Sequence, residues 1–246
     1  MRRLVVIACE VYETELSHLI NTSDVGTVYL ERTPENLQIA QRITRKPVKV
    51  LRDIDFMPRL SSSVSLVVHM LPIGLHIDVD ELWDEVDRCI GRYKGVADAF
   101  LLMYGLCGNA LKGVIARTDV TLFYPCHEGT IVDDCVCSLL GPDRYLEELG
   151  RQGSFFIIPG FAHHRDKMVA RIQERTDLPY SDDLTRMMLA EDGYERALVI
   201  EEGIETEEDE RASCELARRF QLPIERTCGT LALLKDTFEA AIESVR

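Results

Sequence analysis

The chain lacks an excess of positive charge. Its 246 residues include 28 Lys and Arg against 42 Asp and Glu, which gives a formal net charge of −14. Contact with a phosphate backbone needs a basic face, so this balance argues against a nucleic-acid-binding protein. The two most basic stretches, RRLVV (2–6) and TRKPVKVLR (44–52), are short, and we interpret them as solvated surface.

Long apolar runs are also missing. No stretch reaches the roughly 20 residues that cross a bilayer. The opening MRRLVVIACEVYE resembles a signal peptide, but its apolar run ends at Glu10, too soon for the usual apolar region and cleavage site. We therefore expect a cytoplasmic protein without membrane contacts. In that compartment the eight cysteines are expected to be thiols or metal ligands rather than disulfides.

Several motifs that carry known chemistry are absent. The sequence contains no G-x-G-x-x-G and no Walker-type phosphate loop, which argues against a nucleotide enzyme. It contains neither G-x-S-x-G nor H-E-x-x-H. The closest cysteine pair is Cys135 and Cys137, a C-x-C spacing, so a zinc ribbon is excluded.

What the sequence does contain is a regular alternation of apolar, β-branched runs and amphipathic segments. This pattern predicts an α/β fold: a mainly parallel sheet with helices on both faces, in Rossmann-like layers. We predict one domain spanning 1–246, with a weak boundary near residues 60–63, where LSSSV interrupts the pattern. The predicted strands cover residues 3–9, 27–32, 64–70, 97–108, 120–126, 154–160, 196–203 and 224–229.

Cysteines fall where the predicted strands end, and ligands of open α/β sheets bind beyond those carboxyl ends. Cys9 closes the first strand, Cys107 follows the fourth, and Cys135 begins a helical segment after the fifth. These three are the candidate metal ligands. Three thiolates on a tetrahedral metal or a cubane cluster leave one coordination position open. Cys89 and Cys214 lie mid-helix and are interpreted as apolar filler.

Polar groups and glycines near these cysteines complete the predicted site. The candidate cofactor-binding residues around Cys107, where close backbone approach is easiest, are Gly105, Gly108 and Asn109. The candidate catalytic residues are Glu10, Tyr104 and His127. Glu10 has an alternative role as a cap of the helix that follows it, and His127 as a plain surface residue. The pair His163–His164 is interpreted as a surface pair, because adjacent helical residues face different ways.

Five segments, IACEVYETEL, MYGLCGNALKGV, DDCVCSLLGPDRYLEEL, GSFFIIPGF and LPIERTCGTLALLKDTF, resemble the domain-of-unknown-function 1638 family. The resemblance covers most of the chain, and it implies that the recurring cysteines of the family are Cys9, Cys107 and Cys135. This chain carries Asp134 where many relatives have histidine, so the resemblance supports no histidine role there. It also implies an association with corrinoid-dependent methyl-transfer systems in anaerobes.

Three functional hypotheses remain open. The first is a metal-dependent protein whose three-cysteine site holds an iron–sulfur cluster or zinc. The second is a non-catalytic module that binds or delivers a metal or cofactor. The third is an enzyme that uses Cys107 or Cys135 as a nucleophile, with His127 as base and no metal. The expected partner is a small molecule or a corrinoid or methyl-transfer protein, and a homo-oligomer is left open.

Overall fold

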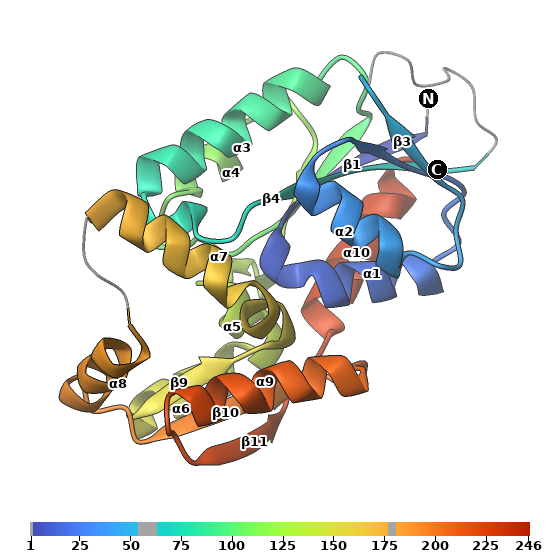
Figure 1. Cartoon of the computed structure of the whole chain (residues 1–246). Helices are drawn as coiled ribbons and strands as arrows, with labels where there is room; N and C mark the ends of the chain where they lie inside the picture. The colour runs from blue at the N-terminus through green and yellow to red at the C-terminus, as the bar shows by residue number, and fades with distance from the viewer. Residues whose placement is uncertain (1, 54–62, 177–180) are drawn as a thin grey trace.

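The computed structural model describes residues 2–53, 63–176 and 181–246, and within them two parallel sheets (Figure 1). The larger sheet has six strands in the order β3-β2-β4-β1-β5-β6. Its central strand β1 is buried along its whole length, as its continuous apolar sequence predicts. The strands are β1 (Arg3–Cys9), β2 (Val28–Glu31), β3 (Val48–Leu51), β4 (Ser65–Leu71), β5 (Ala99–Met103) and β6 (Leu122–Phe123).

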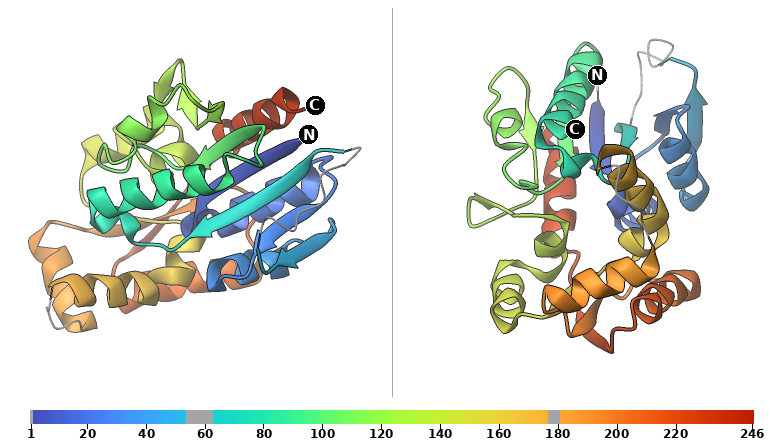
Figure 2. Two further views of the ribbon diagram at one scale, coloured as in Figure 1. Left: turned by 90° about the horizontal axis from the view of Figure 1, so that it is seen from above. Right: turned by 60° about the vertical axis from the view of Figure 1, so that its left-hand side comes forward.

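Helices cover both faces of this sheet, which confirms the predicted α/β class (Figures 1 and 2). Thr33 begins α2 as predicted, because its side chain accepts a hydrogen bond from the Asn36 amide and Pro34 occupies the first turn. On one face lie α1 (Glu13–Thr22), α2 (Pro34–Arg42) and α10 (Ala232–Ser244); on the other lie α3 (Val79–Tyr93) and α4 (Lys112–Ile115).

The smaller sheet has three strands in the order β11-β10-β9 and its own apolar core, which includes Ile157, Val199 and Leu216. Its strand β9 is an edge strand. The strands are β9 (Ser154–Ile157), β10 (Arg196–Glu201) and β11 (Ile224–Cys228), and the helices around them are α5 (Cys135–Leu140), α6 (Pro142–Arg151), α7 (Pro159–Thr176), α8 (Asp182–Glu191) and α9 (Glu207–Arg219).

The chain enters the second sheet after Gly141 and returns to the first through Gly229, so α10 packs beside β5 and α5. The last three predicted strands are therefore confirmed as strands, but they form a separate sheet. Strand β3 was not predicted, because its VKVL sequence lies within a basic stretch. The single-domain organisation stays a prediction, and residues 60–62 of its proposed weak boundary lie outside the described residues.

One close backbone contact joins the two sheets. A Cβ atom at Gly160, at the start of α7, would lie 1.8 Å from the carbonyl oxygen of Val11, just after β1. Glycine at this position lets the second sheet approach the carboxyl end of β1. Around the second sheet itself, a Cβ atom at Gly229 would lie 2.7 Å from the Ile200 side chain and 3.1 Å from the Leu139 carbonyl oxygen.

Candidate functional site

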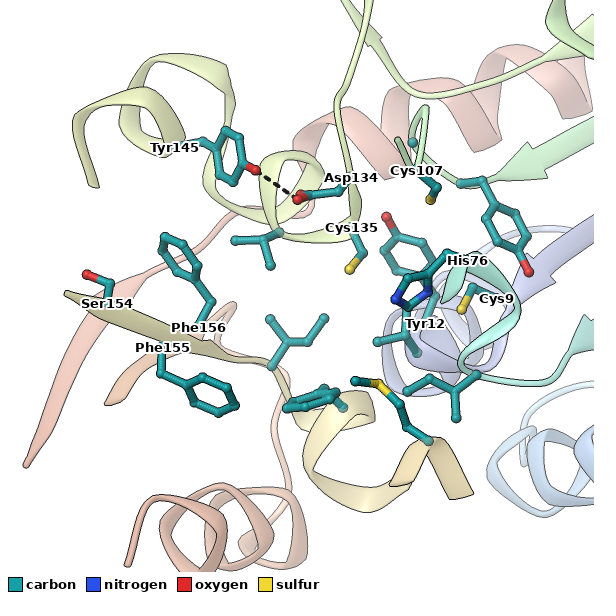
Figure 3. A pocket seen from close by; sticks show the side chains of 18 of the residues that line it. Cys9, Tyr12, His76, Cys107, Asp134, Cys135, Tyr145, Ser154, Phe155 and Phe156 are labelled. Atoms are coloured by element: carbon teal, nitrogen blue, oxygen red, sulfur yellow. Dashed lines mark hydrogen bonds between the residues drawn. The ribbon is translucent and has the colours of Figure 1, made fainter. Parts of the chain in front are cut away.

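A cavity of about 520 Å³ lies between the carboxyl ends of β1 and β5, the start of α5 and the edge strand β9 (Figure 3). This is where ligands bind in open α/β sheets. The cavity is lined by Cys9, Val11, Tyr12, Ile73, His76, Tyr104, Gly105, Cys107, Asp134, Cys135, Val136, Tyr145, Leu149, Ser154, Phe155, Phe156, Ile158, Phe161, Met168 and Tyr194.

All three predicted metal ligands line this one cavity, although Cys9 and Cys135 are far apart in sequence (Figure 3). The parallel register of β1 and β5 pairs Ala8 with Met103, so Cys9 emerges beside Tyr104. Cys9 is buried, whereas Cys107 and Cys135 are partly exposed to the cavity. The sheet geometry thus brings the end of β1, which carries Cys9, beside the end of β5, which Cys107 follows.

Backbone pairing brings the turn that carries Cys107 beside the segment that precedes Cys135. The amides of Leu106 and Cys107 donate to the carbonyl oxygens of Val132 and Asp133, both at 2.9 Å. A Cβ atom at Gly105 would lie 2.6 Å from the Asp134 backbone, so glycine is required for this approach. Cys107 itself has a φ of 46°, a left-handed conformation that is uncommon for a residue with a side chain. The turn thereby presents the Cys107 thiol next to Cys135.

The cysteine thiols are strongly desolvated. Burial raises the pKa of Cys9 and of Cys107 to about 12, and it raises the pKa of Cys135 well above the ordinary thiol value. The charges of Asp134, Cys107 and Cys9 add to the rise at Cys135. This mutual influence means that the three sulfur atoms share one poorly solvated space. At neutral pH they are thiols unless a cation stabilises the thiolates.

Hydrogen bonds fix the start of α5 beside the cavity. The Asp134 side chain caps α5 by accepting from the Cys137 amide at 2.8 Å, and it also accepts from the Tyr145 hydroxyl at 2.8 Å. The Tyr12 hydroxyl donates to Ser138 Oγ at 2.7 Å, since the Ser138 hydroxyl itself donates to the Cys135 carbonyl oxygen. The segment after Cys9 is thereby tied to the turn that carries Cys135.

Tyr104 is the one predicted catalytic residue that lines the cavity. Its side chain is buried, and its hydroxyl group has no hydrogen-bond partner among the described residues. The hydroxyl lies near the Cys9 thiol, although no hydrogen bond of normal geometry joins them. Its presence lowers the pKa of Cys9, but burial raises that pKa by more. Burial, and then the charge of Cys9, raise the pKa of Tyr104 well above its ordinary value.

Glu10 is buried on the other side of its strand end and does not line the cavity. Its carboxylate accepts from the Ile73 amide at 3.2 Å and from Lys167 of α7, and it lies 3.4 Å from His164 Nδ1. It does not cap α1, which has no side-chain cap. Through Lys167 and His164, these contacts join α7 to the end of β1.

The interpretation of His163 and His164 as a surface pair is wrong. His164 is buried and its Nε2 lies 2.7 Å from the Glu13 carboxylate, while His163 Nε2 lies 2.7 Å from the buried Asp209 in α9. Each imidazole ring contacts an acidic partner in a different helix. The two adjacent histidines do face different ways, but both directions lead to such a partner rather than to open solvent. No local pattern identifies these partners, because Glu13 and Asp209 are distant from the histidines along the chain.

His127 lies on an exposed hairpin, β7 (Cys126–His127) and β8 (Thr130–Ile131), and lines a separate hollow beside Pro142. Gly108 and Asn109 are exposed and have positive φ values of 68° and 70°. They shape the turn after Cys107 but do not line the cavity, in contrast to Gly105. The structure therefore does not bring His127, Gly108 or Asn109 to the three thiols.

Sequence reasoning missed most of the wall opposite the thiols. Phe155 and Phe156 line the cavity from opposite sides of β9 (Figure 3). Phe161 and Tyr194 line it as well. The phenylalanine-rich SFFI sequence was recognised as a strand, but periodicity does not reveal which cavity an edge strand borders. His76, whose side chain is exposed, also lines the cavity.

The thiols are suited to a metal but are not arranged around one. Within residues 2–53, 63–176 and 181–246, no three His, Cys, Asp or Glu side chains are gathered into a ready-made metal site. Three soft sulfur donors in one apolar space nevertheless match the ligands of zinc or an iron–sulfur cluster. Binding would require the cysteine side chains to rotate toward a common centre.

Fold and cavity together define an α/β protein of two parallel sheets with a three-thiol cavity between them. The model of the family described as "Protein of unknown function (DUF1638)" matches residues 70–238, so the chain belongs to this family. Cys107 and Cys135 lie inside the match, and Cys9 lies before it. No curated protein and no solved structure matches the chain. None of the helices in the described ranges has the length and apolar character needed to cross a membrane.

Proposed function

We propose that the protein binds zinc or an iron–sulfur cluster through Cys9, Cys107 and Cys135. One coordination position of the bound metal would stay open toward the cavity. The observation that carries the proposal is the convergence of these three thiols on one cavity from three separate elements. Three protein ligands with an open position are typical of catalytic rather than structural metal sites.

Desolvation favours this proposal over a metal-free cysteine nucleophile. A nucleophilic cysteine needs a lowered pKa, usually from a nearby cation or base. Burial above all, and then the charges of Cys9 and Asp134, instead raise the pKa of Cys107 to about 12. His127, the base in the nucleophile hypothesis, borders a different hollow. A metal cation would supply the positive charge that these thiols otherwise lack.

The cavity residues have defined parts in the proposal. The three cysteines would be the ligands, and Gly105 and Asp134 would hold the Cys107 and Cys135 backbones together. Tyr104 would place its unpartnered hydroxyl beside the Cys9 sulfur, where it could donate a hydrogen bond to a thiolate. When bound, the metal would supply a Lewis-acidic or redox-active centre at the cavity wall.

The family resemblance adds a corrinoid or methyl-transfer partner to the proposal. A cavity of about 520 Å³ is in the range of sites for drug-sized ligands, much smaller than a corrinoid with its side chains. In this proposal, any corrinoid is therefore carried by a partner protein, and the cavity holds a small molecule. If the site does not turn over a substrate, the protein would be a metal-delivery module. Transfer of the metal to an acceptor protein would reveal that function.

Metal analysis of protein purified without oxygen tests the proposal. We expect one zinc or one cluster per chain, the latter with a broad visible absorbance that dithionite bleaches. Changing Cys9, Cys107 or Cys135 to Ser should lower the metal content severalfold. Cys228→Ser is the matched control, because Cys228 is exposed and does not line the cavity.

Circular dichroism and thermal melting of each serine variant would establish that it is folded. Folded wild-type protein that stays metal-free after incubation with zinc, and after iron–sulfur reconstitution, would refute the proposal. A metal content that falls equally in the Cys228→Ser control would refute the assignment of these ligands.

A further inference from the structure

The cavity wall opposite the cysteines is apolar and aromatic. Tyr145 and Phe156 have ring centroids 6.1 Å apart, and Phe155 lies 5.9 Å from the rings of both Phe161 and Tyr194. Phe155 also meets Phe220 edge to face at 5.5 Å. Such a network of ring contacts is preformed rather than assembled by a ligand.

The position of β9 at the edge of its sheet explains how one strand supplies this wall. Neighbouring side chains of a strand point to opposite faces, so Phe155 and Phe156 flank the strand edge. Both rings line the cavity because the cavity borders that free edge (Figure 3). Leu149 and Tyr194, which are more exposed, stand at its rim.

The charges around the cavity select against anions. In the described chain, the lining contains neither Lys nor Arg, and its one acidic residue is Asp134. In the metal-free protein, an anionic ligand would lose its hydration without gaining a lysine or arginine partner, and it would meet the Asp134 carboxyl group. Phosphates and carboxylates are therefore poor ligands for this wall.

The volume indicates the size of the ligand. An apolar cavity of about 150 Å³ holds one benzene molecule. A cavity of about 520 Å³ has room for a flat ligand of two or three rings. A ligand of that size would extend from the phenylalanine wall to the thiols.

We propose that the cavity binds a small, uncharged, flat apolar molecule, held between the phenylalanine wall of β9 and the three cysteines. The chemistry of this ligand follows from the wall, and its position beside an open metal site rests on the proposed function. Tyr145 and Asp134, joined by their hydrogen bond, form a polar pair at the cavity that could orient such a molecule.

Isothermal titration of metal-free protein with two probes that share a ring system tests the ligand class. At pH 7, 2-naphthol is uncharged and 2-naphthoate is an anion. We expect 2-naphthol to bind at least about tenfold more tightly, because the anion must be desolvated without a cationic partner. Equal or tighter binding of 2-naphthoate, or no binding of 2-naphthol at its solubility limit, would overturn the proposal.

A variant pair localises the binding. Phe156→Ala should weaken 2-naphthol binding about tenfold, whereas Met187→Ala should leave it unchanged, since Met187 is exposed on α8 and does not line the cavity. If Phe156→Ala does not fold, Phe156→Leu keeps an apolar side chain without the flat ring and should weaken binding at least about threefold. An unchanged affinity in the folded variant would contradict the proposed wall.

Metal-free wild-type protein separates this inference from the proposed function. The aromatic wall and the three cysteines are all intact in it, so 2-naphthol should bind whether or not a metal was ever present. No binding of 2-naphthol to folded, metal-free protein would overturn the inference. Protein that takes up neither zinc nor a cluster but still binds 2-naphthol would refute only the proposed metal site.

Discussion

The reactivity of Cys107 in metal-free protein gives a direct test of the desolvated thiol cluster. Burial raises its pKa from 9.0 to about 12. At pH 7 an ordinary thiol is about one part in a hundred thiolate, and a thiol of pKa 12 about one part in a hundred thousand. The population of the reactive form therefore falls about a thousandfold.

A higher pKa also makes each thiolate a better nucleophile. In thiol–disulfide exchange the logarithm of the rate rises by about 0.4–0.5 per pKa unit, so three units return a factor of about 15 to 30. The net expectation is that Cys107 reacts about 30- to 60-fold more slowly than an ordinary thiol. Limited access within the cavity would slow it further.

The measurement uses a small neutral disulfide reagent at pH 7 on protein stripped of metal by a chelator. Mass spectrometry of peptides follows the modification of Cys107 over time. The matched control is the same residue in guanidinium-denatured protein, where burial is lost. A native rate equal to or above the denatured rate would refute the argument from desolvation and would favour the nucleophile hypothesis.

Two further predictions concern stability. Gly160→Ala would place a Cβ atom 1.8 Å from the Val11 carbonyl oxygen, so denaturant unfolding should show a loss of stability of about 3 kcal/mol or more. Gly150→Ala in α6 is the control, because no atom lies near its new Cβ, and it should gain about 0.5–1 kcal/mol of stability. Equal stabilities of the two variants would contradict the close approach of the two sheets. Burial raises the pKa of Glu15 to about 8, above its unfolded value of 4.5, so the folded state retains a proton that the unfolded state has lost, and stability falls as pH rises from about 4.5 to 8. Glu15→Gln removes this loss, so its unfolding free energy relative to wild type should increase between pH 5 and pH 8 by at most roughly 3.5 kcal/mol. Parallel urea curves at the two pH values would contradict this prediction.

Local patterns in the sequence predicted the elements well because their causes are local. The apolar run of residues 3–9 is strand β1, with the predicted bounds. Thr33 and Pro34 mark the start of α2, as their capping chemistry requires. The positions of Cys9 and Cys107 after strands followed from the same reading, as did the expectation that strand ends share one edge.

Other features depend on contacts that no local pattern encodes. The sequence did not show that the last three predicted strands form a second sheet, and this sheet supplies the aromatic wall. It did not show that Glu10 pairs with Lys167 or that His164 pairs with Glu13, because these partners are more than a hundred residues apart. His127 follows a predicted strand, yet its hairpin turns it toward another hollow.

The sequence by itself determined the α/β alternation, the family and the placement of thiols at strand ends, since each depends on periodicity or on a short motif. Only the tertiary structure decided which of those thiols meet and what faces them. Parallel register brings Cys9 beside Tyr104, and backbone pairing brings Cys107 beside Asp134 and Cys135. The physical reason is that a cavity is formed by packing between distant segments, and close approach at Gly105 and Gly160 sets its shape.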